Sequence, residues 1–202
     1  MRYWLCVHGK QGGTILATGI AARGSIESGR LATEICLGGY GEAKVEKTKY
    51  ADNLTLDSIH VQTNHPAIST LGSQFADWQI KENDYFAIGS GPARALTRKN
   101  KQLYEKIDYQ DESDRTVLVL ETSKEPPENV IHQILEDCKI QPEKLILILT
   151  PTTSIVGSTQ VSGRIVETGL HKLLKLGLDP KLAVSACGLA PIAPVHKKFA
   201  EA

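Results

Sequence analysis

The chain has 202 residues with 23 basic and 23 acidic side chains, and only 5% of its residues are aromatic. This length is sufficient for one large domain or two small ones with a substantial core. Because the net charge is zero and aromatic rings are few, the composition excludes a protein that binds nucleic acid through a basic or base-stacking surface.

The cysteine spacing and the distribution of apolar residues indicate the compartment in which the protein is found. The cysteines form no CxxC or mixed Cys/His pattern and are scattered along the chain, at Cys6, Cys36, Cys138 and Cys187. We therefore expect reduced thiols and no metal site. No apolar run reaches membrane length and the first residues do not resemble a signal peptide, so we expect a cytoplasmic protein with no membrane partner.

The first hundred residues predict short strands and helices joined by tight turns. Ser25 can cap a helix, and residues 52–53 suit the turn of a hairpin. Pro66 suits the first position of a short helix that Asn64 or His65 can cap. In chain order we predict a strand at 14–20, a helix at 25–35, a hairpin of strands at 42–50 and 54–62, a short helix from 66, and strands at 75–80 and 85–88.

The second half of the chain alternates between strands and helices after a charged surface segment at 98–114. The predicted elements are a strand at 115–121, a helix at 128–138, a strand at 145–149, a helix at 159–176 and a strand at 182–186. This βαβαβ order favours right-handed crossovers. We therefore predict an α/β protein with a mixed sheet and a two-part α+β/α/β architecture. Its parts are an α/β part with hairpin-like strands at 1–110 and a βαβαβ part at 111–202.

The stretch from 145 to 176 contains the strongest candidate site. An apolar strand stops at Pro151, a hydroxyl-rich turn follows, and the helical period begins after it. Arg164, Glu167 and His171 share one face of the predicted helix. Such an Arg–Glu pair is usually a solvated ion pair of small energetic value. At a strand tip, however, a carboxylate can orient or deprotonate water while the arginine keeps it ionised.

The remaining candidates are more ambiguous. The turn at 89–92 can cradle an anion through its amides, although a plain tight turn is the simpler interpretation. It has neither the lysine of a P-loop nor the GxGxxG of a dinucleotide fold. His65 and His171 are isolated, no histidine pair has metal-ligand spacing, and no GxSxG elbow supports a serine nucleophile. The residues alone therefore indicate an α/β protein that binds a ligand or hydrolyses one.

Six segments, in order, resemble the methenyltetrahydromethanopterin cyclohydrolase family. They are GSIESG at 24–29, EICLGG at 34–39, HPAISTLGSQ at 65–74, FAIGSGPARAL at 86–96, PTTSIVGSTQVSGRIVET at 151–168 and LDPKLAVSACGLAPIAP at 178–194. The similarity extends over about residues 12 to 195, far beyond what one short motif gives.

The resemblance implies a homotrimeric α/β enzyme of one-carbon metabolism, in methanogenesis or formaldehyde oxidation. Its substrate is a pterin carrier, and it interconverts 5,10-methenyl-tetrahydromethanopterin and water with the 5-formyl form. Because the methenyl carbon is already electrophilic, neither a metal nor another cofactor is required.

The same resemblance implies the roles of individual residues. The family's RIVE motif corresponds here to Glu167, as the acid/base that orients water, and to Arg164, as its electrostatic partner. His171 is then more readily a structural residue. The substrate-binding residues implied by the neighbouring segments are Ser90, Gly91, Pro92, Arg94, Thr152, Ser154 and Gln74.

Some positions depart from the family pattern. Phe75 stands where some archaeal relatives carry lysine, Asp77 where glycine is usual, and Asn64 where aspartate is common. Family members continue past residue 194 and have a helical N-terminal lead-in, so a chain truncated at both ends is expected. The alternative interpretation is therefore a catalytically inactive relative that binds pterin or acts as an interaction scaffold.

Overall fold

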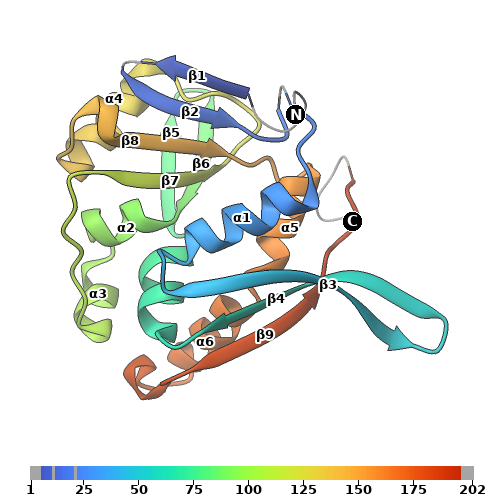
Figure 1. Cartoon of the computed structure of the whole chain (residues 1–202). Coiled ribbons are helices and arrows are strands. Elements are labelled where there is room, and N and C mark those ends of the chain that lie inside the picture. Colours follow the sequence, from blue (N-terminus) through green and yellow to red (C-terminus); the bar gives the residue numbers. More distant parts are fainter. Residues whose placement is uncertain (1–5, 11, 21, 197–202) are drawn as a thin grey trace.

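Two β-sheets with helices packed against them form the protein (Figure 1). The structure, a computed structural model, describes residues 6–10, 12–20 and 22–196. The strands are β1 (Cys6–Lys10), β2 (Gly13–Ala17), β3 (Gly41–Ala51), β4 (Leu54–Thr63), β5 (Trp78–Glu82), β6 (Tyr85–Ser90), β7 (Thr116–Glu121), β8 (Leu145–Leu149) and β9 (Ala186–Pro191). The helices are α1 (Ile26–Cys36), the π-helix η1 (Ala67–Gln74), α2 (Pro92–Thr97), α3 (Lys101–Ile107), α4 (Glu128–Cys138), α5 (Ile155–Ser162) and α6 (Ile165–Lys175), with short 3₁₀ turns η2 (Pro142–Lys144) and η3 (Pro180–Leu182).

The larger sheet has six strands in the order β1-β2-β8-β7-β6-β5. Its centre is parallel, with β8 between β2 and β7, while β1, β5 and β6 pair antiparallel. Apolar side chains of α4 pack on one face, and the end of α1 packs on the other. Strands buried on both faces explain the uninterrupted apolar sequences of β7 and β8. The predicted α/β class with a mixed sheet is confirmed.

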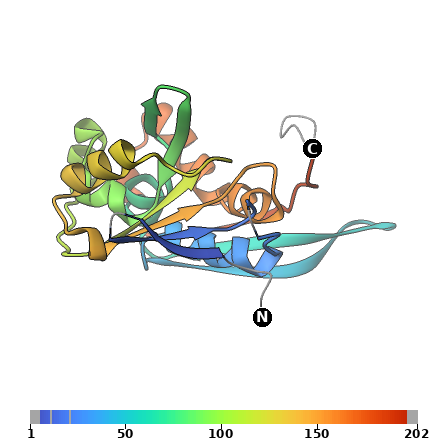
Figure 2. The ribbon, with the colours of Figure 1, turned by 90° about the horizontal axis from the view of Figure 1, so that it is seen from above.

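The smaller sheet consists of β3, β4 and β9, all antiparallel. The hairpin predicted from residues 42–62 is confirmed, and its far end projects beyond the body of the protein in both views (Figures 1 and 2). The strand predicted at 182–186 is wrong. Residues 180–182 form η3, and β9 begins only at Ala186, where it joins β4 rather than the parallel strands. The predicted βαβαβ order therefore holds only as far as β8 and its following helices.

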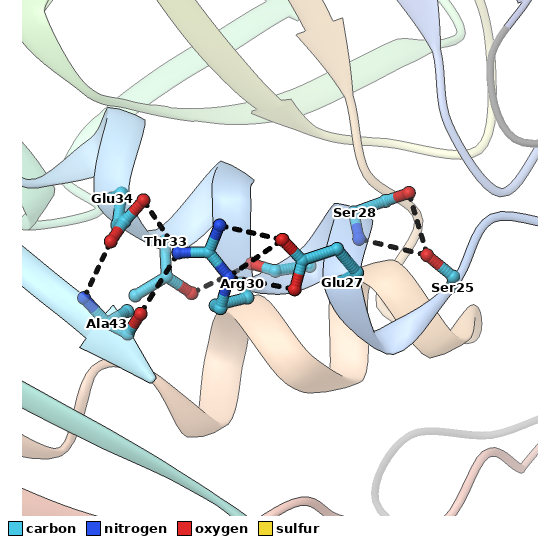
Figure 3. Close-up of polar contacts among 8 residues, drawn as sticks. Ser25, Glu27, Ser28, Arg30, Thr33, Glu34 and Ala43 are labelled. Atoms are coloured by element: carbon cyan, nitrogen blue, oxygen red, sulfur yellow. Dashed lines mark hydrogen bonds and ion pairs between the residues drawn. The ribbon is translucent and has the colours of Figure 1, made fainter. Parts of the chain in front are cut away.

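Helix α1 lies between the two sheets and is anchored by polar contacts at both ends (Figures 1 and 3). The predicted cap is confirmed, since the Ser25 hydroxyl accepts from the Ser28 amide at 3.0 Å. Arg30 donates to the carbonyl of Ala43 at 3.0 Å, and Glu34 accepts from the amide of Ala43 at 3.0 Å. These two side chains satisfy backbone groups on the outer edge of β3, which would otherwise remain open to pairing.

The segment predicted as one helix at 159–176 is two helices that meet at Gly163 and Arg164. A side chain at Gly163 would place its Cβ within 2.5 Å of Thr33 on α1, so α1 and α5 approach closely only because glycine stands there. The break makes Arg164 the residue directly before α6 and places Glu167 in the first turn of that helix.

The π-helix follows Pro66, as the sequence predicts for a short helix, but its predicted side-chain cap is wrong. Neither Asn64 nor His65 caps it. The Thr63 hydroxyl instead accepts from the amide of His65 at 3.0 Å, and Ser69 donates its hydroxyl to the same oxygen at 3.0 Å.

The boundary predicted near residue 110 falls between α3 and β7. Both sheets combine strands from the two sides of this point, because β2 pairs with β8 and β4 pairs with β9.

Candidate functional site

The candidate site lies where the parallel strands end. Chain segments leave β2 and β7 for helices on opposite faces of the sheet, with β8 between them. Ligands of open α/β sheets bind at such a switch point, outside the carboxyl ends of the strands. Two cavities of about 440 and 550 Å³ flank the loop that follows β8, one including Glu121 and Thr152 in its wall and the other Arg23 and Ser154.

Arg164 is the central cation of this region. Its side chain is 13% exposed and forms an ion pair with the carboxylate of Glu121, which is 10% exposed. The same guanidinium donates to the Ser90 hydroxyl at 3.4 Å. Its Nε is buried without a hydrogen-bond partner among the described residues. Buried polar atoms of this kind are typical of a site that binds water or a ligand.

Glu121 is a member of the site that the sequence pattern did not identify. It is the last residue of β7 and so lies at the carboxyl end of a buried strand. Burial raises its pKa, while the Arg164 charge and the Gln160 amide act in the opposite direction. The signal in the sequence that could identify it is a carboxylate directly after the apolar residues of a predicted strand.

Glu167 is 5% exposed, within the first turn of α6. Burial raises its pKa to about 7, with a further increase from Asp77 and Glu121 and an opposing effect of Arg164 and Arg94. Its carboxylate forms no hydrogen bond or ion pair with another described residue. A carboxyl group with a pKa near neutrality can act as both acid and base at physiological pH.

Two further buried side chains complete the network around Arg164. The Cys36 thiol lies 3.4 Å from the Ser90 hydroxyl and accepts from Gln160 Nε2 at 3.7 Å. Burial raises the pKa of this thiol, so it remains protonated at neutral pH. The Gln160 Oε1 atom is buried without a hydrogen-bond partner within the described part of the chain.

Gln74 connects the end of the π-helix to this network. Its amide donates to the carbonyl of Gly163 at 3.0 Å, directly before Arg164. Its Oε1 is a second buried amide oxygen that finds no partner in the described structure. Gln74, Ser90 and Arg164, which the sequence placed in one site, are thus connected through short contacts.

Arg94 lies deeper and is engaged by the protein itself. Its guanidinium is buried, donates to the carbonyls of Leu71 and Gly72 at 3.1 and 3.0 Å, and forms an ion pair with Asp77. Phe75 covers it, with the ring centroid 5.4 Å from the guanidinium carbon. Phe75 and Asp77, two positions at which the sequence resemblance implies a departure, are therefore both contacts of Arg94.

The remaining predicted residues shape the backbone. Gly91 adopts a φ of 105°, and its amide donates to the carbonyl of Ser73 at 2.8 Å, while Pro92 begins α2. Ser154 begins α5, accepting from the Gly157 amide at 3.1 Å. Thr152 lies in the wall of the smaller cavity beside Glu121. Direct contact of these residues with a substrate remains a prediction.

His171 lies one turn beyond Glu167 on α6 and packs against Phe75, with ring centroids 4.5 Å apart and ring planes tilted by 44°. Among the described residues no group of three or more His, Cys, Asp and Glu side chains could hold a metal ion. The site contains a carboxyl group with a pKa near 7, the guanidinium of Arg164 and several buried polar atoms without hydrogen-bond partners among the described residues. This set is suited to positioning water against an electrophile.

Known proteins resemble this chain over almost its whole length. The family model described as Cyclohydrolase (MCH) matches residues 5–202. The methenyltetrahydromethanopterin cyclohydrolase of Methanococcus maripaludis is 46% identical over 188 residues, which is 92% of this chain and 58% of that protein. Those of Methanothermobacter marburgensis and Methanocaldococcus jannaschii are each 45% identical over 92% of this chain, and 59% and 58% of their own lengths are covered.

The chain therefore spans somewhat under two thirds of the curated relatives that it matches. Within the described residues, no helix combines the length and apolar character needed to cross a membrane.

Proposed function

The chain belongs to the Cyclohydrolase (MCH) family, and on that basis we propose that it hydrolyses 5,10-methenyl-tetrahydromethanopterin reversibly to the 5-formyl form. The relatives named above carry the name of this reaction. The observation in the structure that supports it most is Glu167, a buried carboxyl group whose pKa is about 7, on the same helix turn as Arg164.

The reaction needs little more than a positioned water and a group that exchanges protons. The water oxygen bonds to the methenyl carbon as Glu167 accepts one of its protons. The bond from that carbon to the second ring nitrogen then breaks, the nitrogen takes up a proton, and the hydroxyl proton leaves as the formyl C=O forms. One proton is released per turnover. The electrophile is a cationic amidinium, so no other cofactor is required for the attack.

Arg164 has two roles in this proposal. Its charge lowers the pKa of Glu167 against the effect of burial, which keeps a fraction of the carboxylate ionised at neutral pH. Its buried Nε is a free donor that can orient the attacking water. The predicted substrate-binding residues would form the walls of the pterin site, with Gln74 and Ser90 nearest to Arg164.

We also propose that the protein acts in the cytoplasm as a homotrimer, in methanogenesis or formaldehyde oxidation. Exposed apolar side chains support association, since Leu176, Leu182 and Val184 are 72%, 70% and 80% exposed. Light scattering after size exclusion measures the oligomeric state. A mass equal to that of one chain would contradict the trimer.

The test of the proposed reaction follows the absorbance of the methenyl carrier after the protein is added. Decay with wild-type protein, and none with Glu167→Gln, supports the enzyme. Binding of the carrier without decay would instead identify an inactive relative that binds pterin. No binding at all would leave an interaction scaffold.

A further inference from the structure

Arg164 has two buried carboxyl groups within reach, and it pairs with the one outside its own helix. Its Nη2 contacts Glu121 at the end of β7, whereas Glu167, three residues along α6, has no such contact. Spacing alone would favour the pair within the helix. The tertiary fold therefore selects the partner.

We propose that Glu121 is a positioning residue, which holds the Arg164 guanidinium at the strand end and thereby leaves the Glu167 carboxylate free to exchange protons with water. This inference rests on the proposed hydrolysis. A direct ion pair would keep Glu167 ionised and occupy its oxygens, which is unsuited to a group that must accept and return a proton.

The contacts around the pair fix its geometry. Glu121 and Arg164 are both almost fully buried, and the guanidinium also donates to Ser90 at 3.4 Å. Gln160 donates to the Cys36 thiol at 3.7 Å and also acts on the pKa of Glu121. Since a buried cation without a partner is strongly disfavoured, an Arg164 released by Glu121 would move to the nearest remaining carboxylate.

Charged groups from several elements act on Glu167. Besides Arg164 and Glu121, they are Arg94 on α2 and Asp77 after the π-helix. The titratable side chains of the other elements packed on α6 are Asp57 and His60 on β4, Cys187 on β9 and Lys181 on η3, with His171, Lys172 and Lys175 on α6 itself. Of the charged groups that shift the pKa of Glu167, Arg164 and Glu121 form the ion pair, and these two residues are the ones to substitute.

Loss of the Glu121 charge should lower the pKa of Glu167 in two ways. Replacing Glu121 by Gln removes a negative charge that raises the pKa of Glu167. It also releases Arg164, whose positive charge lowers that pKa. Both changes move the titration of Glu167 to lower pH.

Carboxyl ¹³C NMR of glutamate-labelled protein measures this directly and does not depend on turnover. We expect one carboxyl of the wild type to titrate near neutrality and its signal to be lost in Glu167→Gln, which assigns it. In Glu121→Gln the same signal should titrate clearly lower. The matched control is Glu46→Gln, an exposed glutamate on β3, which should leave the titration unchanged. An unshifted signal in Glu121→Gln overturns the inference.

A second comparison tests whether Glu121 acts through Arg164, and it holds even if Glu121→Gln does not fold. Arg164→Gln and the double variant Glu121→Gln/Arg164→Gln contain no unpaired arginine. We expect Glu167 to titrate somewhat lower in the double variant than in Arg164→Gln, because only the direct charge of Glu121 is lost, and this fall should be clearly smaller than the one in Glu121→Gln alone. A fall in the double variant as large as the one expected for Glu121→Gln alone would mean a direct charge effect and would overturn the positioning role.

Kinetics separate this inference from the proposed function. With wild-type turnover established, Glu121→Gln should reduce kcat at pH 7 by about tenfold, because an ion pair with Arg164 occupies the Glu167 oxygens and outweighs the larger ionised fraction. KM should stay within about twofold, and the pH–rate profile should be displaced to lower pH. An unchanged profile overturns the inference while the proposed function stands. If the wild type does not hydrolyse the carrier, the proposed function fails, and the NMR titration still decides the role of Glu121.

Discussion

Arg30 and Arg164 are each flanked by two glutamates, yet the two clusters differ in almost every physical respect. Arg30 on α1 contacts Glu27 at 2.7 Å and Glu34 at 2.7 Å, and these carboxylates are 55% and 31% exposed (Figure 3). The hydrogen bond from Arg30 lowers the pKa of Glu27. Around Arg164, burial raises the pKa of both carboxyl groups.

Burial of the carboxylates, rather than residue type or spacing, distinguishes the Arg30 cluster from the cluster that we propose to be catalytic. Glu27 and Glu34 are open to water, so their pairing with Arg30 contributes little, but Arg30 and Glu34 hold α1 against the edge of β3. In the interior, the same groups have competing protonation states and unpaired atoms, which is the condition for acid–base chemistry.

The largest expected contrast is in activity. Arg164→Gln should lower kcat for hydrolysis of the methenyl carrier by about a hundredfold or more, because Glu167 loses the charge that keeps it partly ionised. Arg30→Gln should stay within about twofold of wild type, since its contacts are confined to α1 and β3. Steady-state assays of both variants measure the difference. Equal losses would remove the distinction between the clusters.

The clusters should also differ in stability. Arg164→Met leaves the Glu121 carboxyl buried without its cation, and we expect a loss of about 3 kcal/mol in the free energy of unfolding. Arg30→Met leaves two carboxylates that water can reach, with an expected loss of about 1 kcal/mol or less. Urea unfolding at neutral pH measures both. A smaller loss for Arg164→Met than for Arg30→Met would reverse the comparison.

The pH dependence of stability isolates Glu167. Its pKa rises from 4.5 to about 7 on folding, so the folded state binds this proton more tightly than the unfolded state. The contribution of Glu167 is complete below pH 4.5 and is lost as the pH rises through about 7, an effect of roughly 3 kcal/mol. Unfolding at pH 5 and pH 8 should show this loss in the wild type and less of it in Glu167→Gln. The same loss in both would contradict the assignment.

The smallest expected effect concerns Glu27. The pKa of Glu27 is lowered in the folded protein, so its effect on stability depends on pH in the opposite direction to that of Glu167. The stabilisation is present above the ordinary pKa of the carboxyl group and is lost as the pH falls through the lowered pKa. Its carboxylate is half exposed, so Glu27→Gln should cost only about 0.5 kcal/mol, and less in 1 M salt. Urea unfolding at low and high salt checks this. A loss above about 1 kcal/mol would contradict the small value expected for an exposed ion pair.

The sequence predicted those parts of the fold that depend on local pattern. The apolar strands, the Ser25 cap and the hairpin all follow from short-range periodicity and turn chemistry. The last strand, predicted at 182–186 but formed by Ala186–Pro191, does not follow from local pattern. Leu182 and Val184 suggest a strand by residue type, but both are exposed, and β9 is defined by its pairing with β4 more than a hundred residues earlier.

In the candidate site, too, contacts between residues far apart in the sequence could not be predicted from local pattern. Arg164 and Glu167 could be identified from their motif, but the ion pair of Arg164 with Glu121 connects residues 43 positions apart. Gly163, which lies between α5 and α6, leaves no room for a side chain beside Thr33 on α1, and no pattern within the helix records this contact. Burial, which decides the chemistry of all three charged groups, is a property of the packed protein.

The most direct test of the central claim is the rate of methenyl-carrier hydrolysis between pH 5.5 and 8.5, for the wild type and for Glu167→Gln. We expect wild-type kcat to rise with pH through a midpoint near 7, where Glu167 loses its proton, and the variant to be at least about a hundredfold slower throughout. Hydrolysis by Glu167→Gln at a rate close to that of the wild type, with the same dependence on pH, would contradict it.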